Sequence, residues 1–301
     1  MEDLYLAIDI GGTNLKSGLI TKNGAIRDTR RITTPHNLAD FMQTIHQMID
    51  SVSEKNINGV AFCSPGKIDH NTIYFGGSLP FLDEINFAKR LSEYHLPMAV
   101  VNDGKANVLA ESWLGNLKDI SNGAAITLGT AIGGGIILNH QLVMGEHGQA
   151  GEFSVMELDY HKSGFNGYAA VTASAVEMIK KINKQNQVSD LTNGRLALAA
   201  VEGNDLESKK IFASFCQKIA YLIINIQSVI DLKRYVIGGG ISANPLVIKE
   251  INRQFDKICD STPIIKHCLT RPEILNAKFA SDANLYGALY NLLSYEEKSN
   301  E

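Results

Sequence analysis

The chain has 301 residues, of which 45% are hydrophobic and 20% are charged, and its formal net charge is −4. These values are typical of a soluble globular protein of about two domains, and the mild negative charge does not favour nucleic acid or an acidic membrane as a partner. The apolar strand that begins at residue 4 leaves no room for a signal peptide, and the least polar long segment, Lys218–Asp231, is shorter than the ~20 residues of a membrane span. The four scattered cysteines form no C-x-x-C pair and indicate free thiols, so we expect a cytoplasmic protein.

The first element in chain order is an apolar run that breaks at a pair of glycines, LYLAIDIGGTNLKSGL over Leu4–Leu19. It fits neither G-x-x-x-x-G-K-[ST] nor G-x-G-x-x-G. The pattern predicts a β-hairpin whose tip, Gly11–Thr13, exposes backbone N–H groups and a threonine hydroxyl to a ligand. Asp9, at the end of the first strand, is placed to orient Mg²⁺ through water.

A helix is predicted next, because Met42, Ile45, Ile49 and Val52 recur at helical spacing. Further along, the stretch MAVVNDGKAN predicts a strand that ends at Asn102-Asp103 and a helix over Ala106–Trp113. An aspartate at a strand end beside a cleft can accept the proton of an attacking hydroxyl, and the neighbouring amide can orient a polyol. The alternative is that Asp103 only caps the helix.

A second glycine-rich stretch, AITLGTAIGGGIIL over Ala125–Leu138, repeats the plan of the first hairpin, with Gly129-Thr130 in the place of Gly12-Thr13. A third cluster, Gly238–Gly240, follows a strand at Tyr235–Ile237, and Ile211–Ile230 forms a long apolar helix. A single cluster would be explained by a tight turn, but three clusters favour ligand binding. Alternating strands and helices with duplicated hairpins predict an α/β fold of two similar domains around a central cleft.

The six stretches DIGGT, AVVNDGKANVLAE, LGTAIGGG, AGEFSV, IGGGIS and SDANLYGAL occur in an order and spacing that resemble the ROK family of sugar kinases and sugar-responsive repressors. The resemblance implies the actin-like (ribonuclease H-like), two-lobed ATPase fold, closing over ATP and a sugar. The implied N-terminal lobe comprises residues 1–114 with the C-terminal helix 282–301, and the implied C-terminal lobe comprises residues 115–281. The sequence boundary is expected near Trp113–Asn122, which is rich in turn residues.

The resemblance also implies the site. Residues expected to border the phosphates of ATP are Asp9, Gly11, Gly12, Thr13 and Lys16. In the second lobe, Gly129 and Thr130 would form the other phosphate loop, and Gly238, Gly239 and Gly240 would lie against the adenosine. Asn102, Asp103 and Glu152 would contact the sugar, with Asp103 as the catalytic base on its 6-hydroxyl. The implied cofactors are ATP and Mg²⁺, and the implied assembly is a homodimer.

The chain departs from the family where a structural zinc is expected. The family's histidine and three cysteines are replaced by Val155, His161, Ser163 and Tyr168, and its last glutamate in the loop is replaced by Ala170. A tetrahedral zinc needs four nitrogen or sulfur donors, so we expect no zinc here. His147 and His161 are interpreted as surface or hydrogen-bonding side chains.

Three functions compete as explanations of these features. The first is an ATP-dependent sugar kinase acting on the 6-hydroxyl of a glucose-type ring. The loss of polar groups at Val155 and Ala170 favours a β-glucoside over free glucose or N-acetylmannosamine. The second is a sugar-responsive transcription regulator, for which the eight residues before Asp9 provide no DNA-binding domain. The third, a nicotinamide-dependent oxidoreductase, would need G-x-G-x-x-G at the first strand–helix turn.

Overall fold

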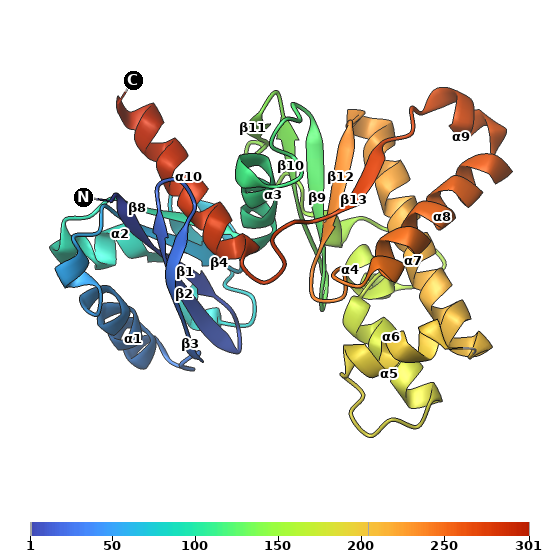
Figure 1. Cartoon of the computed structure of the whole chain (residues 1–301), viewed down its shortest axis with the longest axis horizontal. Coiled ribbons are helices and arrows are strands. Elements are labelled where there is room, and N and C mark those ends of the chain that lie inside the picture. Colours follow the sequence, from blue (N-terminus) through green and yellow to red (C-terminus); the bar gives the residue numbers. More distant parts are fainter. Residues whose placement is uncertain (1, 204, 301) are drawn as a thin grey trace. The chain divides into compact units, whose positions relative to one another are not determined.

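The computed structural model describes residues 2–203 and 205–300, with side chains of the last helix described as far as residue 296. The chain divides into two compact units (Figure 1). The first unit comprises Met1–Lys118, Leu142–Ala150 and Ser281–Glu301, and the second comprises Asp119–Gln141 and Gly151–Ala280. The sequence-based lobes differ from these units in one respect beyond their ends, because the segment Leu142–Ala150 groups with the first unit.

The first unit is built on a five-stranded sheet in the order β3-β2-β1-β4-β8. The antiparallel part is formed by β1 to β3, whereas β4 pairs parallel to β1 and β8 parallel to β4. The strands are β1 (Leu4–Ile10), β2 (Asn14–Thr21), β3 (Ile26–Thr33), β4 (Val60–Ser64) and β8 (Met98–Asn102). A small antiparallel sheet follows β4 in the chain and contains β5 (Lys67–Asp69), β6 (Thr72–Tyr74) and β7 (Ile85–Asn86).

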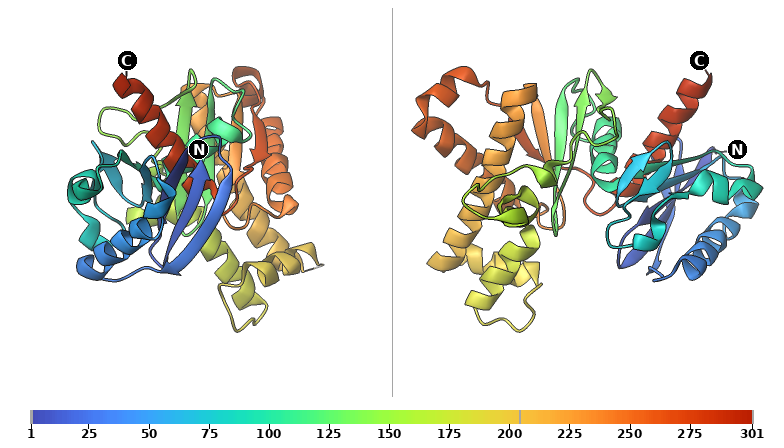
Figure 2. Two further views of the ribbon diagram at one scale, coloured as in Figure 1. Left: turned by 60° about the vertical axis from the view of Figure 1, so that its left-hand side comes forward. Right: turned by 180° about the vertical axis from the view of Figure 1, so that it is seen from behind.

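Side chains on both faces of β1 are buried, and they enter two different cores because alternate side chains of a strand point to opposite sides. Leu6 and Ile8 of β1 enter a core that includes residues of α1 (Leu38–Asp50). Tyr5 and Ala7 enter a second core with residues of α3 (Asp103–Leu114) and α10 (Ala283–Asn300). The last helix therefore covers one face of the first sheet. Figure 2 shows it lying along that sheet beside α3. A short helix, α2 (Phe87–Arg90), precedes β8.

The second unit repeats the arrangement, with a sheet in the order β11-β10-β9-β12-β13. A hairpin of β9 and β10 pairs antiparallel, and β12 pairs parallel to both β9 and β13. The strands are β9 (Gly123–Leu128), β10 (Ile132–Leu138), β11 (Gln141–Leu142), β12 (Arg234–Gly238) and β13 (Glu273–Asn276). The predicted duplication is confirmed, since each sheet begins with a hairpin and continues with parallel strands.

The second unit also contains the helices α4 (Ala169–Thr172), α5 (Ala175–Gln185), α6 (Gly194–Glu202), α7 (Leu206–Ile230), α8 (Pro245–Ser261) and α9 (Pro263–Cys268). Among the described helices, α7 is long and apolar enough to cross a membrane by length and composition alone. Half of its most apolar 18-residue window is buried inside the protein, where α7 contacts α4, α5, α6 and α8. These contacts are those of a core helix.

Candidate active site

The tip of the first hairpin is a short turn whose glycines are needed for space. The Gly11 N–H donates to the Asn14 carbonyl at 3.0 Å, and a Cβ on Gly11 would lie 2.8 Å from that oxygen. A Cβ on Gly12 would lie 2.4 Å from the Ser78 hydroxyl. Neither glycine has a positive φ, so the requirement for glycine at this turn is steric and not conformational.

The turn is held from behind by the end of β3. The Thr34 hydroxyl donates to the Gly11 carbonyl at 2.6 Å, and the Thr34 N–H donates to the Thr13 carbonyl at 3.0 Å. The Thr13 side chain itself is exposed. The turn is therefore fixed through its backbone carbonyls, while the side chain of Thr13 stays exposed.

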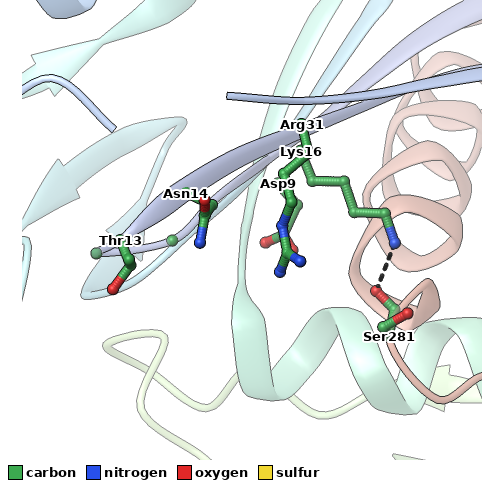
Figure 3. A pocket seen from close by; sticks show the side chains of 8 residues that line it. Asp9, Thr13, Asn14, Lys16, Arg31 and Ser281 are labelled. Carbon is green, nitrogen blue, oxygen red and sulfur yellow. Dashed lines mark hydrogen bonds between the residues drawn. The ribbon is translucent and has the colours of Figure 1, made fainter. Parts of the chain in front are cut away.

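The strands below this turn place one carboxylate and two cations in a row. Strand register pairs Asp9 with Lys16 and Lys16 with Arg31, and directly opposite residues of antiparallel strands share a face. These three residues line a pocket of about 350 Å³ together with the turn and Ser281 (Figure 3). Lys16 forms an ion pair with Asp282 and donates to the Ser281 carbonyl at 3.0 Å. The hairpin is thereby tied to the segment that leads into α10.

Asp9 accepts hydrogen bonds from two neighbouring elements. Asn284 at the start of α10 donates to Asp9 Oδ1 at 2.9 Å, and the thiol of Cys63 on β4 also donates to this carboxylate. Asn107 of α3 donates to Asn284 Oδ1 at 2.8 Å and to the Asp103 carbonyl at 2.9 Å. A chain of amides therefore connects Asp9 to the helix that carries Asp103.

Burial dominates the electrostatics of Asp9. The pKa of this carboxyl is raised from 3.8 to about 6, mainly by burial and also by repulsion from Asp103, against the opposing effects of Asn284, Cys63 and Lys16. Burial also raises the pKa of the Cys63 thiol, so this cysteine is a hydrogen-bond donor and not a thiolate. The effect of Asp103 on the pKa of Asp9 means that the two predicted carboxylates are close enough to interact electrostatically.

The predicted sugar-binding pair lies at the junction of β8 and α3. Asn102 is the residue that caps α3, accepting at its side-chain oxygen from Gly104 N–H at 2.9 Å and Lys105 N–H at 3.4 Å. Its amide donates to the Gly66 carbonyl at 2.8 Å. Asp103 is the exposed first residue of the helix, and its Oδ1 accepts from the adjacent Gly104 N–H. The helix starts at Asp103, three residues before the predicted start.

In the second unit, two of the predicted glycine segments come together. Register pairs Gly238 with Thr127, and Gly239, with φ +99°, packs so closely that its Cβ would lie 2.1 Å from the Leu128 carbonyl. Gly129 follows Leu128 directly and accepts at its carbonyl from the Ala175 N–H at 3.0 Å, at the N-terminus of α5. Thr130 is exposed, and added Cβ atoms on Gly129 and Gly240 would meet little or nothing. These two positions leave room for a ligand.

Glu152 lies in the second unit, just before a short turn at Phe153–Val155. Its side chain is exposed and accepts a hydrogen bond from the Ser154 hydroxyl. Val155 is 54% exposed, whereas Ala170 at the start of α4 is buried. The two positions that lack the family's polar groups are thus apolar, one at the surface and one beneath it.

The loop in which the family holds zinc is closed here by backbone hydrogen bonds. The carbonyl of Gly167 accepts from the N–H groups of Leu158 at 2.9 Å and Asp159 at 3.1 Å. The rings of Phe165 and Tyr168 stack with centroids 5.4 Å apart. Within residues 2–203 and 205–300, no three His, Cys, Asp or Glu side chains gather as a metal site. The absence of a structural zinc stays a prediction.

Four residues of this arrangement were missed by sequence reasoning. They are Arg31, Asn107, Ser281 and Asn284. Arg31 occurs in the charged stretch RDTRRIT, which is typical of an exposed strand, and only strand register brings it beside Lys16. Asn284 could have been suspected from the SDANLYGAL motif, although nothing in the sequence indicates that it reaches Asp9.

Comparisons with known proteins bear on the family and the fold of the chain. A family model described as "ROK family" matches residues 5–294. A beta-glucoside kinase of Listeria monocytogenes is 29% identical over 97% of this chain and 98% of its own length. An N-acetylmannosamine kinase of Haemophilus influenzae is 29% identical over 95% of this chain and 94% of its own length.

Among solved structures, a ROK family protein from Streptococcus pneumoniae in complex with sucrose matches with a TM-score of 0.89 and 29% identity. The match covers 98% of this chain and 99% of the other. The predicted actin-like ATPase fold is confirmed. The family model covers nearly the whole chain and includes both hairpins, and the chain belongs to the ROK family.

Proposed function

We propose that this protein is an ATP-dependent sugar kinase that transfers the γ-phosphoryl group to the 6-hydroxyl of a glucose-type ring, with a β-glucoside as the preferred substrate. The kinase class rests on the family and on curated relatives that are named kinases. The observation that carries the proposal is the pocket at the first hairpin, where a buried carboxylate, a lysine and a glycine turn come together beside the start of α3.

Asp103 is the proposed general base. Its carboxylate stands at the carboxyl end of β8, on the same edge of the parallel strands as Asp9. A sugar hydroxyl is a weak nucleophile until its proton has an acceptor, and a carboxylate at the edge of the sheet can take that proton. Because Asn102 caps α3, the helix does not need Asp103 for that purpose. Asn102 and Glu152 are proposed to bind other hydroxyls of the sugar.

The phosphates of ATP are proposed to bind at the two hairpins, at Gly11, Gly12, Thr13 and Lys16 in the first unit and at Gly129 and Thr130 in the second. The adenosine is proposed to lie against Gly238–Gly240. Magnesium in such sites is held by phosphates, water and one or two carboxylates, so the single carboxylate of Asp9 in the pocket fits it. When bound, the ion would neutralise phosphate oxygens, and Asp9 would orient it through water.

The preference for a glycoside rests on Val155 and Ala170. In these positions the family resemblance implies polar groups that contact or support the C1–C2 edge of the sugar. Side chains of valine and alanine give that edge an apolar border and no hydrogen-bonding partner, so rejection of substituted sugars is weakened. Relatives that are named beta-glucoside kinases, among them the one from Listeria monocytogenes, support this choice.

The test is ADP release with Mg·ATP and four acceptors, which are glucose, N-acetylmannosamine, cellobiose and phenyl β-glucoside. We expect the highest kcat/KM for the two β-glucosides, and phosphorus-coupled NMR of the product should place the phosphate on carbon 6. A preference for N-acetylmannosamine, the substrate named for the Haemophilus relative, would refute the glycoside preference and leave the kinase standing. No ADP release with any acceptor would refute the kinase.

A further inference from the structure

Arg31 on β3 faces the pocket of the first hairpin. Its register partner is Lys16, whose own partner on β1 is Asp9, so the three side chains lie on one face of three adjacent strands. Arg31 lines the same pocket as the Gly11–Thr13 turn. In Figure 3 its side chain points to the same side of the hairpin as that of Asp9, whereas Lys16 extends away toward Ser281.

The charges of this pocket are unevenly paired. Lys16 is engaged by Asp282 and by the Ser281 carbonyl, which offsets much of its positive charge. Arg31 is exposed, and among the ion pairs of the described residues none includes it. Its neighbour Arg30, on the opposite face of β3, lies 3.4 Å from Asp28 instead. Arg31 is therefore the cation of this pocket that is available to a ligand.

We propose that Arg31 binds a phosphate group of ATP at the first hairpin and adds its positive charge to that of Lys16, which is shared with Asp282. A guanidinium presents a planar fork of donors that matches two phosphate oxygens, which a lysine ammonium cannot reproduce. The Gly11–Thr13 turn lines the same pocket, so its backbone can approach the same anion from the tip of the hairpin. This inference rests on the proposed kinase function, and it adds a residue that neither the motif nor the sequence pattern identifies.

The test is calorimetric binding of the non-hydrolysable analogue AMPPNP with Mg²⁺, with adenosine as the ligand that lacks phosphates. Arg31→Gln is expected to weaken AMPPNP binding roughly ten- to a hundredfold, the value of a charge-assisted hydrogen bond, and to leave adenosine binding unchanged. Arg31→Lys should give an intermediate loss. Since Arg31 is exposed, the melting temperature should stay close to that of the wild type.

Arg30→Gln is the matched control, because it removes the same charge from the next residue of the strand on the other face. Equal losses in Arg30→Gln and Arg31→Gln would mean a general effect of charge and overturn the proposal, as would normal AMPPNP binding by Arg31→Gln. If the wild type binds AMPPNP through Arg31 and phosphorylates no sugar, the proposed function fails and this site stands. If the wild type is an active kinase and Arg31→Gln binds AMPPNP normally, the function stands and this site fails.

Discussion

Asn102 and Asp103 are neighbours that perform different tasks at the start of α3. The side-chain oxygen of Asn102 caps the helix, and one N–H of its amide donates to the Gly66 carbonyl. Asp103→Asn keeps the shape of the side chain and removes its basicity. We expect kcat to fall by about 10²- to 10⁴-fold, while AMPPNP binding and the melting temperature change little. A variant with near-normal kcat would contradict the assignment of Asp103 as the base.

Burial of the Asp9 carboxylate lowers the free energy of unfolding of the protein at neutral pH. A pKa of about 6 in the folded protein against 3.8 corresponds to about 3 kcal/mol of unfolding free energy lost at neutral pH. Asp9→Asn is therefore expected to raise the melting temperature at pH 7 and to abolish kinase activity, because an amide lacks the charge that orients magnesium. Differential scanning calorimetry and the ADP assay measure the two effects.

The pH dependence of that gain has a defined sign. Below about pH 4 the Asp9 carboxyl is protonated in the folded and unfolded states, so the variant and the wild type should be equally stable in this respect. Between pH 4 and 6 only the folded form keeps its proton, and wild-type stability declines as pH rises. The stability advantage of Asp9→Asn over the wild type should therefore grow between pH 4 and 6 and stay constant above pH 6. A gain that is largest at pH 4 would contradict the burial of this charge.

Sequence motifs predicted the residues that follow a local rule and missed those that depend on distant partners. Asp9, Gly12 and Asp103 stand at strand ends or turns, where their type and spacing are informative. Arg31 and Asn284 acquire their positions from strand register and from the packing of α10, which no short motif records. The sequence also did not show why each glycine is required. Gly11 and Gly12 are required because a Cβ would meet neighbouring atoms, and Gly239 is required for its positive φ.

At the scale of elements, the first hairpin permits a test that separates ligand contact from packing. Gly12→Ala places a Cβ at the Ser78 hydroxyl, so a loss of ATP binding by itself is ambiguous. The double variant Gly12→Ala/Ser78→Gly removes that contact. We expect both variants to bind AMPPNP at least about tenfold more weakly than the wild type, with Ser78→Gly alone close to normal. Recovery of affinity in the double variant would show that Gly12 serves packing against Ser78 only.

The loop over residues 157–168 gives a second prediction for an element. The loop is closed by hydrogen bonds to the Gly167 carbonyl and by the stacked pair Phe165–Tyr168, contacts that need no metal. Elemental analysis of purified protein is expected to find far less than one zinc per chain, and a strong chelator should leave the melting temperature unchanged. Stoichiometric zinc would mean that the correspondence of this loop with the family's zinc signature is mistaken.

The limits of the elements were predicted less well than their existence. The helix after β8 starts at Asp103 and not at Ala106, because Asn102 supplies the cap. Helix α7 begins at Leu206 and not at Ile211, with Asp205 accepting from the Ser208 N–H at 2.7 Å. In both cases the apolar pattern locates the buried middle of a helix, whereas a polar side chain outside that pattern sets its start.

At the scale of the whole molecule, the two sheets share one strand order, and this duplication was visible in the repeated glycine hairpins. The sequence did not indicate which unit every chain segment joins. The segment Leu142–Ala150 belongs to the first unit, although it follows the second hairpin in the chain. A Cβ on Gly148 would lie 2.8 Å from the Ile68 carbonyl, so this segment packs against β5. The homodimer stays a prediction, which light scattering of the purified protein can test.

The position of α10 has a consequence for how the protein is made. Leu285, Leu289 and Leu292 bury against the first sheet, and a Cβ on Gly287 would lie only 1.9 Å from the Ala106 carbonyl of α3. One face of the sheet that begins at residue 4 is therefore covered by residues that are synthesised after all strands of both sheets. During synthesis the sheet of the second unit can form before α10 is available. Until then, one apolar face of the first sheet stays exposed to solvent. Nascent chains arrested after residue 280 are expected to be cleaved by protease within the first unit, and chains extended through α10 and clear of the exit tunnel are expected to resist.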